Sequence, residues 1–127
     1  MSSRPKAVRI LIADDHRLFA EALEAMLATE GRLEVLGRAA DGREAVELAR
    51  ELEPDVVLLD ISMPVMDGFE AATRISKLPA RPAVLMLTGS NARADVDRAR
   101  QAGASGYVTK DRIAAELIDA ILEVAGR

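Results

Sequence analysis

The sequence of 127 residues contains no cysteine and no tryptophan, and it has only one tyrosine, two phenylalanines and one histidine. The absence of cysteine excludes disulfides and thiolate chemistry, and it is typical of proteins from a reducing compartment. So few aromatic rings cannot form a platform on which nucleic-acid bases stack. The formal net charge of −4 also gives no basic excess of the kind that indicates direct nucleic-acid binding.

The sequence also lacks a long hydrophobic run. The early apolar run, residues 10–13, is followed at once by two aspartates, and it is too short for a signal-peptide core or a membrane span. The eight glycines form neither a dinucleotide-binding nor a P-loop motif. We therefore expect one domain over residues 1–127, located in the cytoplasm, with no membrane attachment.

What the sequence does contain is a short apolar run, residues 56–59, that ends in Asp60. Pro54 and Pro64 bound this run, which predicts a central strand buried on both faces. An unpaired charge is costly to bury inside such a strand. Asp60 is therefore expected at the carboxyl end of the strand, where a parallel sheet opens and ligands bind.

Short apolar stretches alternate with helical periodicity along the whole chain. The expected strands are residues 8–13, 33–40, 55–60, 83–88 and 105–109, and the expected helices are 16–29, 41–53, 68–77, 91–102 and 111–125. This alternation predicts an α/β fold with a doubly wound, five-stranded parallel sheet. The expected strand order is the flavodoxin-like 2-1-3-4-5.

Polar residues stand at the expected carboxyl ends of four of these strands: Asp14 and Asp15, Asp60, Thr88, and Lys110. In this strand order three carboxylates converge, and their repulsion either raises their pKa values or requires a cation. Oxygen ligands of this kind suit Mg²⁺. An aspartate beside a metal ion, a lysine and a threonine is equipped as a nucleophile toward phosphorus.

Several motifs resemble the receiver domain of two-component response regulators, and the resemblance covers essentially the whole chain. They are Asp14-Asp15 after a strand, residues 60–64 with Asp67-Gly68, residues 88–90, and residues 103–110. The phrases at residues 14–16 and 60–64 are similar to the LuxR/NarL-type subfamily, whose receivers precede a helix-turn-helix domain. The resemblance implies transcription regulation as the output, although no effector domain follows in this chain. The chain is thus expected to be a stand-alone receiver or an excised N-terminal domain.

The resemblance also implies roles for individual residues. Asp60 would accept a phosphoryl group from the phosphohistidine of a sensor histidine kinase. Asp15, Asp60 and the backbone carbonyl at Ser62 would hold Mg²⁺, with Asp14 acting largely through water.

Two further residues are implied to act on the phosphoryl oxygens, namely Lys110 and Thr88, and Tyr107 would be the aromatic side chain that follows the movement of the threonine. The domain would not be an enzyme in the ordinary sense, since it would catalyse only its own phosphorylation and dephosphorylation. Many receivers have proline after this lysine, in a cis peptide; here Asp111 follows, and the geometry of that bond stays open.

Two other functions are alternatives. A metal-dependent phosphohydrolase of the haloacid-dehalogenase type needs a second acid two residues after its nucleophile, and that position is Ser62. A pseudo-receiver that only binds partners is disfavoured by the intact Asp60, Thr88 and Lys110.

The only histidine, His16, is interpreted as a helix-start residue near the site, because one imidazole alone is not a metal motif. In the first helix, Phe19, Leu23, Met26 and Leu27 have a helical spacing, and Leu18 lies off the face of Phe19, Leu23 and Met26.

The last helix has an apolar stripe that is wider than one sheet contact requires. If Leu117, Ile121 and Val124 point inward, then Ile118 and Leu122 are partly exposed. We interpret Leu18, Ile118 and Leu122 either as scattered surface residues or as a self-association patch for a homodimer.

Overall fold

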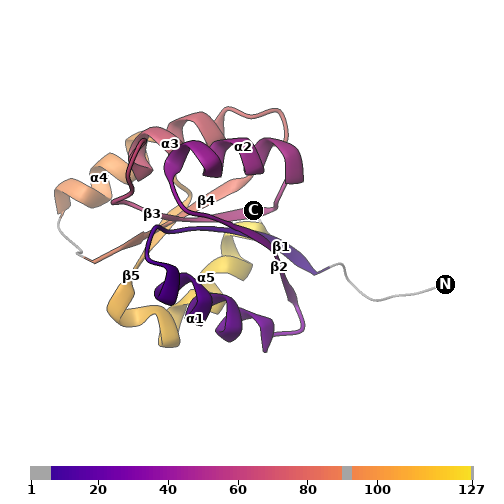
Figure 1. The fold of residues 1–127 in the computed structure, drawn as a ribbon. Helices are drawn as coiled ribbons and strands as arrows, with labels where there is room; N and C mark the ends of the chain where they lie inside the picture. Colours follow the sequence, from indigo (N-terminus) through magenta and orange to yellow (C-terminus); the bar gives the residue numbers. More distant parts are fainter. Residues whose placement is uncertain (1–6, 90–92, 127) are drawn as a thin grey trace.

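The computed structural model describes residues 7–89 and 93–126. A central sheet lies between two layers of helices (Figure 1). The five strands follow the order β2-β1-β3-β4-β5, and all neighbouring strands are parallel. The fold class and the strand order predicted from the sequence are therefore confirmed.

The elements lie close to their predicted positions. The strands are β1 Val8–Ala13, β2 Leu33–Ala39, β3 Val56–Asp60, β4 Ala83–Thr88 and β5 Gly106–Thr109. The helices are α1 Arg17–Ala28, α2 Gly42–Leu52, α3 Gly68–Ser76, α4 Arg93–Gln101 and α5 Ile113–Ala125. The last helix begins later than predicted, because Lys110–Arg112 forms a 3₁₀ turn first. The predicted start of α4, residue 91, lies outside the described residues.

Local signals in the sequence explain where two helices begin. Asp41 caps α2 by accepting a hydrogen bond from the Glu44 N–H, and the Glu44 carboxylate accepts one from the N–H of Ala40. Asp67 caps α3 in the same way by accepting from the N–H of Glu70. These caps fix the start of the helices that follow β2 and β3.

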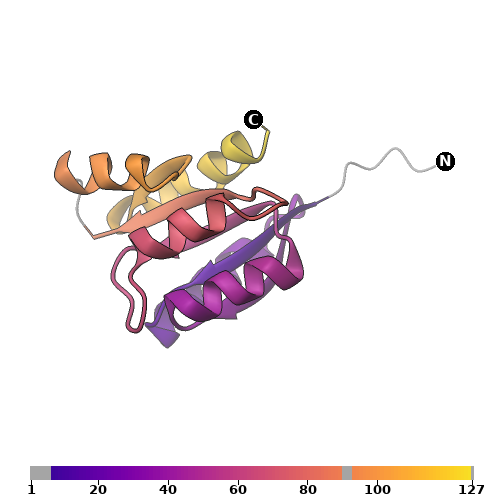
Figure 2. The ribbon, with the colours of Figure 1, turned by 90° about the horizontal axis from the view of Figure 1, so that it is seen from above.

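The sheet separates two hydrophobic cores. Helices α2, α3 and α4 cover one face, and α1 and α5 cover the other (Figures 1 and 2). Alternate residues of the buried strand β3 serve the two cores: Val57 and Leu59 face α2 and α3, whereas Val56 and Leu58 face α1 and α5. All five residues of β3 are buried, as its apolar sequence predicted.

The inward face of α1 differs from the prediction. The buried residues are Ala20, Leu23 and Leu27, whereas Phe19 and Met26 are only partly buried against the same core. The ring of Phe19 instead contacts the ammonium group of Lys110, the residue that follows β5. The side chain of Leu18 is 82% exposed.

The inward face of α5 agrees with the prediction, since Leu117, Ile121 and Val124 are buried. Ile118 and Leu122 are partly buried and pack against the core that α1 shares. Their part in a self-association patch stays a prediction.

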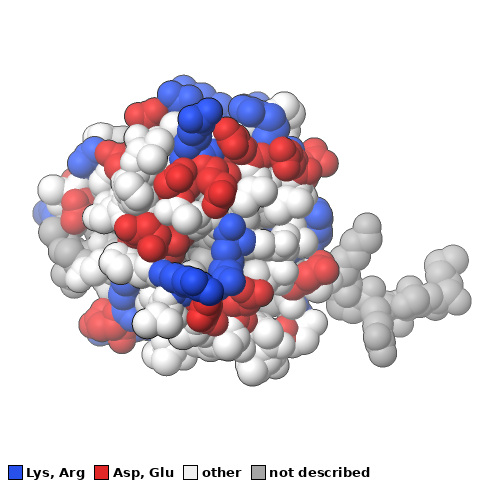
Figure 3. Space-filling view, in the orientation of Figure 1, with Lys and Arg blue, Asp and Glu red and all other residues white. Residues whose placement is uncertain are grey.

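The face shown in Figure 3 carries acidic and basic side chains side by side, without a field of one sign. Within residues 7–89 and 93–126, no helix combines the length and the apolar character needed to cross a bilayer.

Candidate functional site

Two buried carboxylates lie next to each other at the carboxyl edge of the sheet. Asp14 directly follows β1, and Asp60 is the last residue of β3. The two strands are neighbours in the sheet, with Ala13 paired to Leu59. Asp14 and Asp60 are 3% and 4% exposed. Such burial is costly for two like charges, so the site requires a positive partner.

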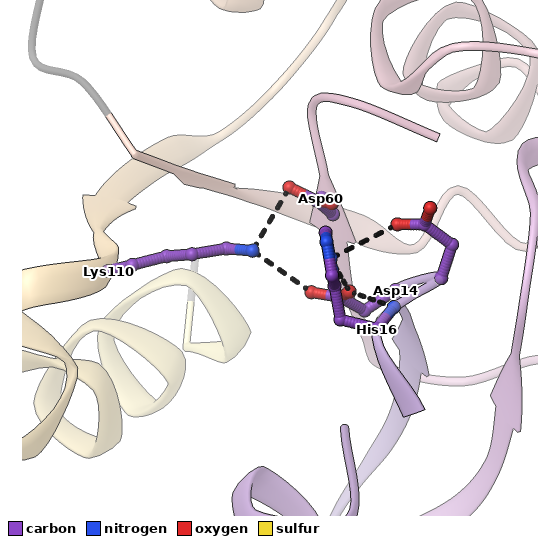
Figure 4. Close-up of polar contacts among 5 residues, drawn as sticks. Asp14, His16, Asp60 and Lys110 are labelled. Atoms are coloured by element: carbon purple, nitrogen blue, oxygen red, sulfur yellow. Dashed lines mark hydrogen bonds and ion pairs between the residues drawn. The ribbon is translucent and has the colours of Figure 1, made fainter. Parts of the chain in front are cut away.

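Lys110 supplies a positive charge from the other side of the site. It follows β5 directly, and its Nζ lies 3.3 Å from Asp14 Oδ2 and 3.5 Å from Asp60 Oδ1 (Figure 4). The ammonium group also lies over the ring of Phe19, 4.4 Å from the ring centroid. The sequence predicts the position of Lys110, whereas its periodicity places Phe19 only in the core.

The Asp60 carboxylate is only partly satisfied. Its Oδ2 is buried and has no hydrogen-bond partner among the described residues. Burial raises the pKa of the Asp60 carboxyl above its usual range, and the charge of Asp14 adds to this. Lys110 and the backbone N–H of Ser62 act in the opposite direction and lower that pKa. A buried acceptor with a free oxygen can receive a metal ion or a covalent substituent.

Asp15 and His16 extend the cluster toward solvent. The side chain of Asp15 is 33% exposed, and that of His16 is 67% exposed. The imidazole Nδ1 lies 3.2 Å from Asp14 Oδ1 (Figure 4), and it lies 3.3 Å from Asp15 Oδ1. His16 stands at the cap position of α1, so its prediction as a helix-start residue is confirmed. Its contact with both carboxylates was not predicted.

Together these residues form one potential metal-binding group. Asp14, Asp15, His16 and Asp60 each offer one ligand atom, and all four atoms lie within 4.8 Å of one another. Carboxylate oxygens are hard ligands that suit Mg²⁺, and the unpaired Asp60 Oδ2 leaves room for a bond to a cation. The donor set therefore fits the metal that the sequence predicted.

Thr88 and Tyr107 lie on β4 and β5, the two strands that follow β3 in the sheet. Thr88 is the last residue of β4 and is 4% exposed. Tyr107 lies on β5, and its side chain is 42% exposed. It borders a cavity of about 250 Å³ whose other walls include Val96 and Ala99 of α4. The predicted switch pair is thus placed on adjacent strands beside α4.

The loop between β3 and α3 is fixed at its base. The N–H of Gly68 donates a 2.8 Å hydrogen bond to the carbonyl of Ile61, and a Cβ at position 68 would collide with the carbonyl oxygen of Asp60. Only glycine therefore allows the start of α3 to lie directly against the end of β3. At the tip of the loop, Val65 is 77% exposed and has a positive φ of 69°.

The remaining predicted site residue, Ser62, is exposed on this loop. A cleft of about 520 Å³ opens beside it, lined among others by Asp15, Pro64 and Arg98. The peptide bond between Lys110 and Asp111 is trans, which answers the question that the sequence left open.

Comparisons with known proteins show what this chain is similar to. A family model described as the response regulator receiver domain matches residues 10–122. The chain is 41% identical over 124 residues to a protein named as a transcriptional regulatory protein, NarL, from Mycobacterium tuberculosis, an alignment that covers 96% of this chain and 56% of the relative. The chain spans about half the length of the curated relatives it matches.

Solved structures of response regulators are also similar to this chain. The signal receiver domain of NarL from Mycobacterium tuberculosis is similar with a TM-score of 0.88 and 40% identity, over 96% of this chain and 98% of that one. A two-component response regulator of the LuxR family from Aurantimonas sp. is similar with a TM-score of 0.89 and 36% identity, over 96% of this chain and 88% of that one.

Proposed function

Because the chain belongs to the response regulator receiver domain family, we propose that it accepts a phosphoryl group on Asp60 from a sensor histidine kinase. The observation that carries this proposal is the buried Asp60 Oδ2, which has no partner among the described residues although Lys110 lies 3.5 Å from the other oxygen. The relatives of the chain include NarL and a LuxR-family regulator. The LuxR/NarL-type subfamily predicted from residues 14–16 and 60–64 is therefore confirmed.

In the proposed reaction, an Asp60 carboxylate oxygen attacks the phosphorus of the phosphohistidine. A P–O bond forms, the P–N bond breaks, and the electron pair of that bond stays on the imidazole ring of the kinase. Lys110 and Thr88 bind the phosphoryl oxygens, because both lie at strand ends beside Asp60. The cleft of about 520 Å³ between the β3–α3 loop and Arg98 gives the donor access.

We propose that Asp15, Asp60 and the carbonyl of Ser62 hold Mg²⁺, with Asp14 acting largely through water. When bound, this ion neutralises charge on the phosphoryl oxygens during transfer. The chain's own part is to hold the carboxylates together against their repulsion. The side chain of Lys110 does this from one side, through its contacts with Asp14 and Asp60.

The phosphoryl group then changes a surface of the domain. We propose that Thr88 moves toward it and that Tyr107 turns from its exposed position into the space this leaves. The cavity of about 250 Å³ beside Tyr107 gives the ring and α4 room to adjust. Because Tyr107 borders this cavity with Val96 and Ala99, the turn would alter the α4–β5 face.

The location of the domain in the cell, its output and its self-association are also proposed. We infer that the domain acts in the cytoplasm and controls a DNA-binding effector domain or another partner, since NarL, of which the alignment covers 56%, is named as a transcriptional regulatory protein. The domain does not bind nucleic acid itself. Leu18, Ile118 and Leu122 form a homodimer patch in this proposal.

The test is incubation with Mg²⁺ and acetyl phosphate, followed by intact-mass measurement. We expect a gain of one phosphoryl group in the native chain and none in Asp60→Asn, whose amide is isosteric but not nucleophilic. An adduct of equal yield on the variant would overturn the assignment. Rapid hydrolysis of free phosphate esters would instead support a phosphohydrolase, for which Ser62 offers no second carboxylate.

A further inference from the structure

The imidazole of His16 lies within contact distance of the carboxylates of both Asp14 and Asp15. Its Nδ1 lies 3.2 Å from a carboxylate oxygen of Asp14 and 3.3 Å from one of Asp15. The side chain makes no hydrogen bond to the start of α1, and it is 67% exposed, so neither capping nor burial explains its orientation. Its contacts with the carboxylates do.

These distances match those between neighbouring ligands of a metal ion. Nitrogen and oxygen ligands lie about 2.0–2.1 Å from ions such as Zn²⁺, which places neighbouring ligand atoms about 3.0–3.4 Å apart. A metal ion bound by Nδ1 and the carboxylate oxygens therefore requires little movement of these ligands.

A second observation points to the same place. The Asp60 Oδ2 is buried and unpartnered within the described part of the chain, and Asp60 belongs to the same group of ligand atoms within 4.8 Å. An ion held by His16 and Asp15 thus finds a further oxygen ligand in the interior.

We propose that His16 makes this cluster a binding site for transition-metal ions such as Ni²⁺ and Zn²⁺, with Nδ1 as a direct ligand beside the carboxylates. Imidazole is a favoured ligand of these ions and a poor one for Mg²⁺. The two classes of ion therefore use overlapping but different ligands: Mg²⁺ needs only the oxygens, and Ni²⁺ or Zn²⁺ adds His16. This inference rests on the metal site of the proposed function and extends it to metal selectivity.

Competition follows from the shared ligands. Both kinds of ion require oxygens of Asp15 and Asp60, so we expect a bound transition-metal ion to compete with Mg²⁺. Affinities for ligands of this type rise along the series from Mn²⁺ to Ni²⁺ and Cu²⁺. A low concentration of such an ion would therefore keep Mg²⁺ from the receiver site.

The experiment is calorimetric titration with Ni²⁺ and, separately, with Mg²⁺, on the native chain and on His16→Gln. We expect the variant to bind Ni²⁺ at least tenfold more weakly and to keep its Mg²⁺ affinity within about twofold. Asp119→Asn, which removes an exposed carboxylate on α5, is the matched control and should change neither affinity.

Nuclear magnetic resonance gives a second readout. The chain has one histidine, so diamagnetic Zn²⁺ should shift a single pair of imidazole ¹⁵N resonances, with the larger change at Nδ1. Equal Ni²⁺ affinity in the native chain and His16→Gln, or no change at Nδ1, would overturn the inference. Absence of Mg²⁺ binding to the native chain would contradict the proposed function, whichever result His16 gives.

Discussion

The ammonium group of Lys110 lies over the ring of Phe19, 4.4 Å from its centroid, while it also contacts Asp14 and Asp60. The ring comes from α1 and the lysine from the turn after β5, so the contact joins two distant parts of the chain. A cation over an aromatic face is stabilised by the ring's electrons. Phe19 therefore helps to hold the lysine against the carboxylates.

We expect Phe19→Leu to slow phosphorylation of Asp60 by acetyl phosphate, because the lysine loses its aromatic support. A cation–π contact of about 0.5–1 kcal/mol corresponds to a roughly two- to fivefold effect. Phe19→Tyr keeps the aromatic face and should keep the rate. The measurement is the rate of adduct formation by mass spectrometry, with thermal unfolding as a check on packing. Equal rates in the Leu and Tyr variants would show that the ring only fills space.

The raised pKa of Asp60 predicts how stability depends on pH. The folded state binds more protons than the unfolded chain between the usual carboxyl pKa, about 4, and the raised value. Stability should therefore fall as pH rises through this window. Asp60→Asn removes the buried charge, so we expect the variant to be more stable than the native chain at neutral pH.

The measurement is the urea midpoint of both proteins across this pH range without divalent ions. The difference should shrink toward acidic pH, where the native Asp60 is protonated. A difference that does not vary with pH would mean that the charge on Asp60 is not the cause.

Asp15→Ala should weaken Mg²⁺ binding by at least tenfold from a millimolar native affinity. Weak binding is expected because Mg²⁺ keeps several waters and takes few protein ligands. Calorimetry or the Mg²⁺-dependent rise in melting temperature provides the measurement. Undiminished affinity in the variant would remove Asp15 from the metal site.

Lys110→Ala should leave Mg²⁺ affinity intact or raise it severalfold. Removal of the ammonium group exposes Asp14 and Asp60 to their mutual repulsion, which a divalent ion relieves. The same variant should lose the response at Tyr107, since Lys110 no longer pairs with the phosphoryl group. The two readouts are a Mg²⁺ titration and the tyrosine fluorescence after phosphorylation. Weaker Mg²⁺ binding would contradict this role of the lysine.

Leu18→Glu should weaken self-association of the phosphorylated protein by about tenfold or more, which corresponds to about 1.4 kcal/mol. Leu18 suits this test because it is 82% exposed, so its replacement leaves the core intact. Ala94→Glu places the same charge on the exposed side of α4 and serves as the control. Sedimentation velocity gives the measurement. A native protein that stays monomeric at high concentration, phosphorylated or not, would rule out the patch.

Much of the fold followed from local patterns. Short apolar runs with polar ends predict parallel strands, and the topology of such a sheet brings all carboxyl ends to one edge. Asp14, Asp60 and Lys110 could therefore be placed together without knowledge of any side-chain conformation, and the structure shows them in contact.

The features that the sequence did not predict depend on which side of α1 faces the sheet and on the direction of individual side chains. Phe19 and Ala20 are both apolar, and periodicity alone does not tell which of them faces the sheet. The direction of the His16 ring is set by contacts with Asp14 and Asp15, which sequence spacing does not specify. His16 and Phe19 both lie at the start of α1, where the chain leaves the sheet and the regular sequence pattern of the strand ends.

The loop between β3 and α3 offers a position for a fluorescent reporter. Its base is fixed by the hydrogen bond from Gly68 to Ile61, whereas Val65 projects from its tip. Because the sequence contains no cysteine, Val65→Cys would introduce a single thiol for attachment of a fluorescent dye. A dye there would sit five residues beyond Asp60 without entering the core. The chemistry of one buried carboxylate could then be followed in real time, in the intact domain, by a change in emitted light.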